Sequence, residues 1–138
     1  MLYHNTWDSL YKYPFGAVAE GTDVTVRMHA QTGDLQYARV LVRNTSTNRS
    51  DLTNMEKVST ITVDEEEVDI WEATFTPDEI GVYGYKFIVG DGDTVKYYGE
   101  DGNEGKTGTV GDNNGLFFQL TVYDKDYTTP DRMKAAVV

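Results

Sequence analysis

The chain has 138 residues, which is enough for one well-buried core and too few for two ordinary domains. Its net charge of -11, from 23 acidic and 12 basic residues, makes nucleic acid and anionic membrane surfaces poor partners. The absence of cysteine excludes a disulfide framework and a thiolate zinc site.

The N-terminal segment MLYHNTWDSLYKYPFG does not resemble a secretion signal. It carries charges and proline where a signal peptide needs an uninterrupted apolar stretch. Nowhere does the sequence hold the run of ~18 apolar residues that a membrane span requires. We therefore expect a soluble, cytoplasmic protein, or an extracellular one if a leader has been removed.

From residue 22 onward the sequence alternates between apolar and polar residues, which is typical of strands with one buried face. In segment 22–30, Val24, Val26 and Met28 fall on one side, whereas Arg27 falls on the other. The same alternation predicts strands in the segments 37–44, 69–75, 82–89 and 115–123 and, more weakly, 57–63.

Three of the connections between these strands have a distinct composition. The pair Asp91-Gly92 favours a two-residue hairpin turn between two alternating segments. The acidic run DEEEVD, 64–69, predicts a solvated loop between two strands because like charges repel. The stretch 99–115 holds six glycines and no periodicity, so it predicts a long surface loop.

Near the C-terminus the pattern changes from strand to helix. Thr129 can cap a helix, Pro130 suits its first turn, and Asp131 favours the positive end of the backbone dipole. This short helix is the only one that we expect. The apolar run 135–138 that follows resembles the beginning of a buried strand.

Several short strands at roughly ten-residue spacing, with turn residues between them, predict an all-β fold. We expect a single immunoglobulin-like antiparallel β-sandwich. The segment GVYGY, 81–85, is a glycine bend followed by tyrosines that open a late strand, and it suits the tyrosine corner of such sandwiches.

Residues for catalysis are scarce. The only imidazoles are His4 and His29, and neither an HExxH nor a GxSxG pattern occurs. The Gly105-Lys106-Thr107 triplet lacks the earlier glycine of a phosphate loop, since that position is Glu100. We therefore predict no catalytic residues in this chain.

Loop carboxylates and amides provide the material of a calcium site without its usual spacing. None of them follows the EF-hand pattern, so we predict no cofactor and keep calcium as an alternative to ordinary turn chemistry. The candidate oxygen ligands are Asp91, Asp93, Glu100, Asp101, Asn103, Asp112 and Asn113.

Aromatic residues are abundant, with ten tyrosines, five phenylalanines and two tryptophans. Flat rings next to polar groups can bind neutral sugars, because pyranose C–H groups stack on them. Five rings share a face with aliphatic residues and are predicted to be core: Trp71, Phe75, Tyr85, Phe87 and Phe118. The predicted surface rings, which can alternatively pack against a neighbouring domain, are Trp7, Tyr11, Tyr13, Tyr37, Tyr97, Tyr98 and Tyr123.

Four segments of the sequence, taken in order along the chain, resemble one known family. They are HNTWDSLYKYPFGAV, GTDVTVRMHAQTGDLQYARV, WEATFTPDEIGVYGYKFIVGDGDTVKYYGEDG and LTVYDKDYTTPDRMKAAVV. The family is the carbohydrate-binding module family 34 type, the N-terminal module of cyclomaltodextrinases, neopullulanases, maltogenic amylases and amylopullulanases. The resemblance implies an immunoglobulin-like domain at 1–125. Residues 126–138 would be the linker and the start of the (β/α)8 barrel of a glycoside hydrolase family 13 enzyme, with the first barrel strand beginning at 136–138.

The resemblance also implies a function. The parent enzyme would hydrolyse α-glucosidic bonds in starch, pullulan or maltodextrins, with its catalytic carboxylates in the barrel. This domain would bind an α-glucan and hold the enzyme on it. The residues that we expect to contact sugar, by stacking or by hydrogen bonding, are Trp7, Tyr37, Tyr97, Tyr98, Lys96 and Glu100. The alternative is a structural domain that forms a homodimer in the full-length enzyme and shapes the active site without binding polysaccharide.

Overall fold

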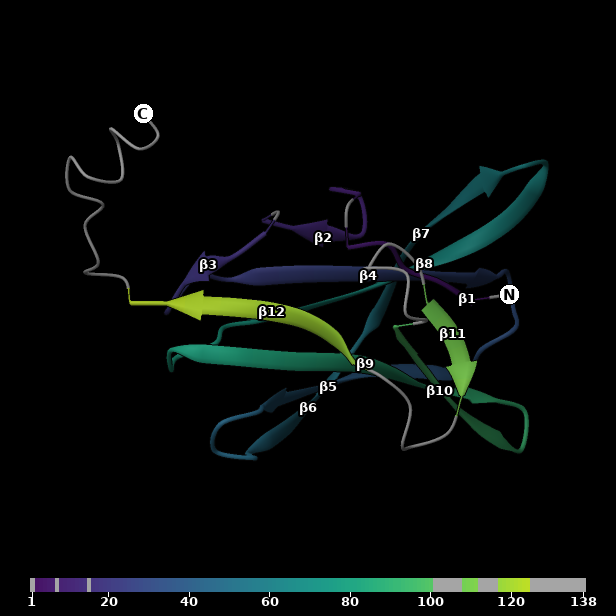
Figure 1. Ribbon diagram of the computed structural model, residues 1–138. Coiled ribbons are helices and arrows are strands. Elements are labelled where there is room, and N and C mark those ends of the chain that lie inside the picture. Colours follow the sequence, from purple (N-terminus) through teal and green to yellow (C-terminus); the bar gives the residue numbers. More distant parts are fainter. Residues whose placement is uncertain (1, 7, 15, 101–107, 112–116, 125–138) are drawn as a thin grey trace.

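A computed structural model describes residues 2–6, 8–14, 16–100, 108–111 and 117–124. Within these ranges the chain is all-β (Figure 1). The strands are β1 (Leu2–Tyr3), β2 (Lys12–Tyr13), β3 (Val18–Ala19), β4 (Val24–Gln31), β5 (Tyr37–Asn44), β6 (Ser50–Asn54), β7 (Glu56–Val63), β8 (Glu66–Phe75), β9 (Gly81–Asp91), β10 (Thr94–Glu100), β11 (Gly108–Gly111) and β12 (Phe118–Tyr123).

The strands form two sheets that pack face to face (Figure 1). In the first sheet the order is β1-β4-β8-β7, and β2 also pairs with β4. In the second sheet the long strand β9 has β5 along one edge, and β10 and β12 along the other. All pairings are antiparallel except that of β12 with β3. The predicted immunoglobulin-like β-sandwich is therefore confirmed.

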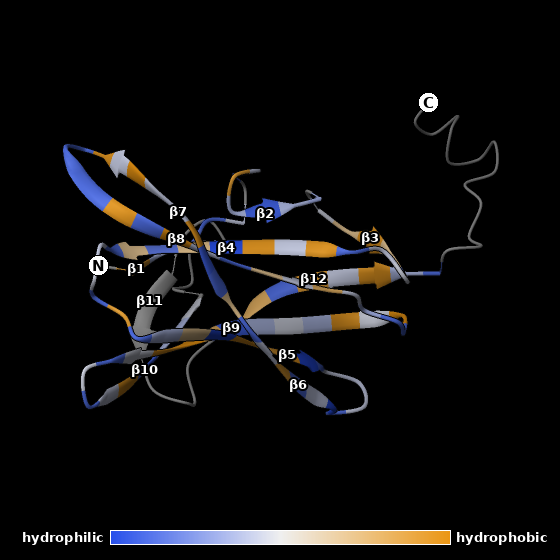
Figure 2. Cartoon of the chain, turned by 180° about the vertical axis from the view of Figure 1, so that it is seen from behind, coloured by the Kyte–Doolittle hydropathy of each residue, from blue (hydrophilic) through white to orange (hydrophobic). Residues whose placement is uncertain are grey.

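The core lies between the sheets and is built by the alternation of apolar and polar residues (Figure 2). Val24, Val26 and Met28 of β4 are fully buried, as the pattern predicts. Of the five rings predicted to be core, four are buried and Phe75 is half-buried at the end of β8.

The predicted hairpin turn lies one residue later than expected. Asp91 pairs with Thr94, so the two connecting residues are Gly92 and Asp93. Gly92 has a φ of 64°, which a glycine adopts without steric cost at the first position of such a turn.

The acidic run 64–69 is not a solvated loop. Only Asp64 and Glu65 form the turn, both with positive φ, and β8 begins at Glu66. Asp69 is buried, because backbone and side-chain donors from neighbouring segments satisfy its carboxylate. The prediction of a solvated loop was wrong because it treated all six positions as one charged surface.

The stretch 99–115 also differs from the prediction. β10 continues to Glu100, and β11, at Gly108–Gly111, pairs with it in antiparallel register. Glycine-rich segments carry little apolar alternation, so the sequence pattern did not show this edge strand. The pattern likewise gave no strand at Ser50–Asn54, where β6 pairs with β5.

The predicted tyrosine corner is present. The hydroxyl oxygen of Tyr83 accepts a hydrogen bond from the backbone N–H of Glu79 at 3.3 Å, just before β9 begins. Gly81 lies between the two residues with a φ of 138°. The corner fixes the connection from β8 to β9, which crosses from one sheet to the other.

The predicted C-terminal helix and the apolar run 135–138 fall outside the described residues. Among the residues that are described, no helix has the length and apolarity needed to cross a bilayer.

Candidate functional site

The outer face of the second sheet brings two of the predicted sugar-binding tyrosines together. Across β5, β9 and β10, Arg39 and Tyr97 both pair with Ile88, and Tyr37 and Val95 both pair with Gly90. Paired residues point to the same side of a sheet. These six positions therefore form one surface, opposite to the core, which we call the aromatic face.

The aromatic face is flat around Tyr37. Gly90 has no side chain, and a Cβ placed there would overlap the Tyr37 ring, so this ring lies against the backbone of β9. The guanidinium carbon of Arg39 lies 4.6 Å from the centroid of the same ring. Val95, at the end of the face, is 50% exposed. A ring, a cation and aliphatic side chains thus share one accessible surface.

Tyr98 does not belong to this face. It was predicted to be a surface residue, but only 2% of it is exposed. Because it pairs with the buried Phe87, its side chain points inward, opposite to that of Tyr97. Its ring lies 6.1 Å from that of Phe118, and its hydroxyl oxygen accepts the His4 backbone N–H at 3.2 Å. Tyr98 therefore has no ring face free for a sugar.

Lys96 also lies away from the aromatic face. It pairs with the core residue Val89, and its Nζ is 2.8 Å from a carboxylate oxygen of Asp91. The hydrogen bond that Lys96 donates to this carboxylate raises the pKa of Lys96. Lys96 thus stabilises the β9–β10 hairpin on the side opposite to Tyr97. Trp7 and the Glu100 side chain lie outside the described residues.

The remaining predicted surface rings are scattered. Tyr11 is 4% exposed, so the prediction that it lies on the surface was wrong. Tyr13, on β2 of the first sheet, is 65% exposed, and Tyr123, at the end of β12, is 45% exposed. Neither belongs to the aromatic face.

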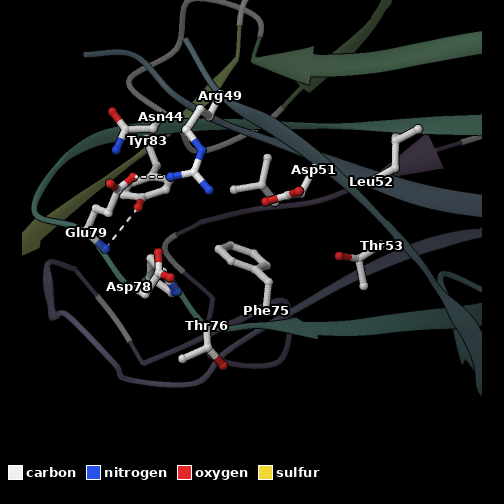
Figure 3. Close-up of a pocket in the computed structure, with 12 residues that line it drawn as sticks. Asn44, Arg49, Asp51, Leu52, Thr53, Phe75, Thr76, Asp78, Glu79 and Tyr83 are labelled. Atoms are coloured by element: carbon white, nitrogen blue, oxygen red, sulfur yellow. Dashed lines mark hydrogen bonds and ion pairs between the residues drawn. The ribbon is translucent and has the colours of Figure 1, made fainter. Parts of the chain in front are cut away.

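The structure also contains a hollow that the sequence did not predict (Figure 3). It has a volume of about 390 Å³ and lies where β5 and β6 of the second sheet face the end of β8. We call it the inter-sheet hollow. Its principal lining residues are Asn44, Asp51, Thr53, Phe75, Asp78 and Tyr83.

The polar lining of the hollow comes from positions where alternation calls for apolar residues. Asn44 follows Val40 and Val42 on the inward side of β5. On β6, Asp51 pairs with Val42 and Thr53 with Val40, so both point inward, whereas Leu52 points outward and is 58% exposed. This inverted polarity is the sequence signal that could have located the hollow.

The two histidines are hydrogen-bonded core residues. His4 is fully buried, with Nε2 2.9 Å from the Tyr85 hydroxyl. His29 is 3% exposed, with Nδ1 2.7 Å from the Tyr11 hydroxyl. Burial lowers the pKa of both. Neither imidazole is accessible to a substrate.

Within the described ranges, no group of three or more histidine and carboxylate side chains could hold a metal ion. Among the candidate calcium ligands, Asp91 pairs with Lys96 and Asp93 lies in the hairpin turn. The positions 101, 103, 112 and 113 and the Glu100 side chain fall outside those ranges, so calcium stays the untested alternative to the prediction of no cofactor.

The comparisons with known proteins agree with one another. A family described as "Alpha amylase, N-terminal ig-like domain" matches residues 1–123. An amylopullulanase of Thermoanaerobacterium thermosulfurigenes is 35% identical over 142 residues, which cover 99% of this chain and 7% of that protein. An amylopullulanase of Thermoanaerobacterium saccharolyticum is 33% identical over 138 residues, which cover 99% of this chain and 11% of that protein.

A solved structure of a cyclomaltodextrinase has the same fold, with a TM-score of 0.61 and 18% sequence identity. The similarity covers 87% of this chain and 19% of that one. The chain thus corresponds to a small part of each of these relatives.

Proposed function

Because this chain belongs to the family of alpha-amylase N-terminal immunoglobulin-like domains, we propose that it is a non-catalytic α-glucan-binding module. Its parent would be an α-amylase family glycosidase that acts on starch, pullulan or maltodextrins. The names of the relatives support this assignment, since two of them are amylopullulanases and one is a cyclomaltodextrinase.

The aromatic face is the observation that supports sugar binding most directly. Tyr37 and Tyr97 lie on one accessible surface, with Ile88 between them and Arg39 beside them. A glucan chain that follows this surface can stack pyranose C–H groups on the Tyr97 ring, while the Arg39 guanidinium group, which lies over the Tyr37 ring, donates hydrogen bonds to hydroxyls.

Calorimetric titration with maltoheptaose tests the proposal. We expect measurable binding, and we expect Tyr97→Ala to weaken it about tenfold, because one stacking contact is lost. Tyr13→Ala is the control, since it makes the same change at a more exposed ring on the other sheet. No heat of binding at millimolar sugar, or an equal loss in the control, would contradict the assignment.

Catalysis is assigned to the rest of the parent polypeptide. The carboxylates of the hollow line a space at the edge of a sandwich, and the two histidines are buried. The barrel that we expect after residue 125 would provide the acid and the nucleophile. The barrel is also the expected partner of this module within the same chain.

The alternative function is a structural one, in which the domain forms a homodimer and shapes the active site. The β7–β8 hairpin favours this structural role. The tip of the hairpin extends beyond the rest of the first sheet (Figure 1), and Val58 of β7 is 49% exposed. Light scattering of the full-length enzyme with and without residues 1–125 separates the two functions. A dimer that persists without the domain eliminates the structural role.

A further inference from the structure

We infer that the inter-sheet hollow is a second sugar site, which binds one terminal glucosyl unit of an α-glucan chain. The identity of the ligand rests on the proposed function. The existence of a site rests on the hollow itself, which shares no residue with the aromatic face.

The size and floor of the hollow fit a small ligand. Its volume of about 390 Å³ falls in the range of small-molecule sites, which is roughly 300–1,000 Å³. The half-buried ring of Phe75 lies in the middle of the lining residues (Figure 3). Phe75 and Tyr83 give the hollow the aromatic surface on which a pyranose stacks.

The polar groups around the Phe75 ring are not engaged elsewhere. Asp51, Thr53 and Asp78 use their side chains in no hydrogen bond or ion pair within the described part of the chain. Carboxylates accept hydrogen bonds from hydroxyls, and threonine both donates and accepts. Three groups that match a polyhydroxylated ligand therefore surround one ring.

The charge of the hollow selects against anions. Its one cation, Arg49, is paired with Glu79 at 3.4 Å, and this leaves the carboxylates of Asp51 and Asp78 uncompensated among the described residues. A phosphate or carboxylate ligand would be repelled. A neutral sugar has hydroxyls for the carboxylates and an apolar face for the ring.

NMR titration of the ¹⁵N-labelled chain distinguishes the two sites by the shape of the probe. Maltose has chain ends, so we expect it to shift the backbone amide signals of Thr53, Phe75 and Asp78. β-Cyclodextrin is a closed ring without an end and should shift only signals of the aromatic face. We expect Asp51→Asn, which keeps the size of the side chain, to weaken maltose binding about tenfold.

Asp93→Asn is the matched control, because it makes the same change in the exposed hairpin turn. Phe75→Leu gives a second test that keeps an apolar floor without the ring, and it should also weaken maltose binding. Maltose shifts at the aromatic face alone would overturn this inference and leave the proposed function intact. If maltose shifted signals neither at the aromatic face nor at the hollow, both this inference and the proposed function would be overturned. Equal losses of maltose binding in Asp51→Asn and Asp93→Asn would overturn this inference.

Discussion

His4 shows how one residue can connect the two sheets of the sandwich. Its Nδ1 lies 2.6 Å from the Arg27 backbone oxygen on the first sheet, and its Nε2 lies 2.9 Å from the Tyr85 hydroxyl on the second. A carbonyl oxygen can only accept, so Nδ1 carries the proton and Nε2 accepts from Tyr85. The neutral imidazole therefore bonds to both sheets, whereas a protonated one would have to donate to the Tyr85 hydroxyl, which would then need another acceptor for its own proton.

The pH dependence of folding should reflect this arrangement. Burial lowers the pKa of His4 to about 3, and the unfolded chain has the ordinary value of about 6.5. Between these values the unfolded state binds the proton more strongly, so the free energy of unfolding should fall as the pH falls. The slope from this group is at most about 1.4 kcal/mol per pH unit.

Urea unfolding at pH 7, 5 and 4 measures the slope. Because carboxylates also titrate in this range, the informative quantity is the difference between the native chain and His4→Gln. The variant should be less stable at pH 7 and should lose less stability on acidification. Equal pH profiles for the two chains would mean that His4 is not the titrating group.

At the scale of the element, Asp69 attaches the β7–β8 hairpin to the sandwich. Its carboxylate accepts hydrogen bonds from the Gly33 N–H at 3.1 Å and the Thr60 hydroxyl at 2.8 Å, and lies 3.6 Å from Lys57 Nζ. Burial by itself would raise the pKa of Asp69, but these groups outweigh it, so the pKa is lowered.

We expect Asp69→Ala to lower the free energy of unfolding by about 1–3 kcal/mol, because the Gly33 N–H and the Thr60 hydroxyl lose their acceptor. Hydrogen exchange should accelerate at the amides of β7 more than at those of β9. Glu67→Ala serves as the control, because it removes a carboxylate at an exposed position two residues earlier on the same strand. Uniform acceleration across both sheets would argue against a local role.

A second element-scale prediction concerns the contact between β5 and β9. Gly90→Ala places a methyl group where the Tyr37 ring lies, so the ring must move off β9. We expect stability to fall by about 1–3 kcal/mol and maltoheptaose binding to weaken. In a Tyr37→Ala background the same change should have almost no effect on binding, since the ring is already absent. An equal effect in both backgrounds would show that Gly90 acts by another route.

For the whole molecule, the prediction follows from the proposed division between sugar binding in this domain and catalysis in the rest of the parent enzyme. Deleting residues 1–125 from the parent enzyme should reduce its activity on soluble starch more than its activity on maltotriose. The reason is that only a long chain can occupy the module and the barrel at once, which raises its effective concentration at the active site. Equal losses on both substrates would indicate a structural contribution to the barrel instead.

The sequence by itself determined the strands and the fold class. Alternation of apolar and polar residues is a local property, and it correctly located the long strands and most of the core. It also indicated the tyrosine corner at Tyr83, because the glycine bend and the ring lie close together in the chain. Short or glycine-rich edge strands such as β6 and β11 carry too little alternation to be found in this way.

The tertiary structure alone decided which of the predicted rings form a candidate binding surface. Tyr97 and Tyr98 are adjacent aromatic residues, and alternation says only that they point to opposite sides. Pairing of Tyr98 with Phe87, eleven residues away, places it in the core and leaves Tyr97 outside. The inter-sheet hollow likewise exists only because β6 and the end of β8, from different sheets, lie opposite each other. Local patterns specify faces, whereas contacts between distant segments specify which face is inside and which spaces remain unfilled.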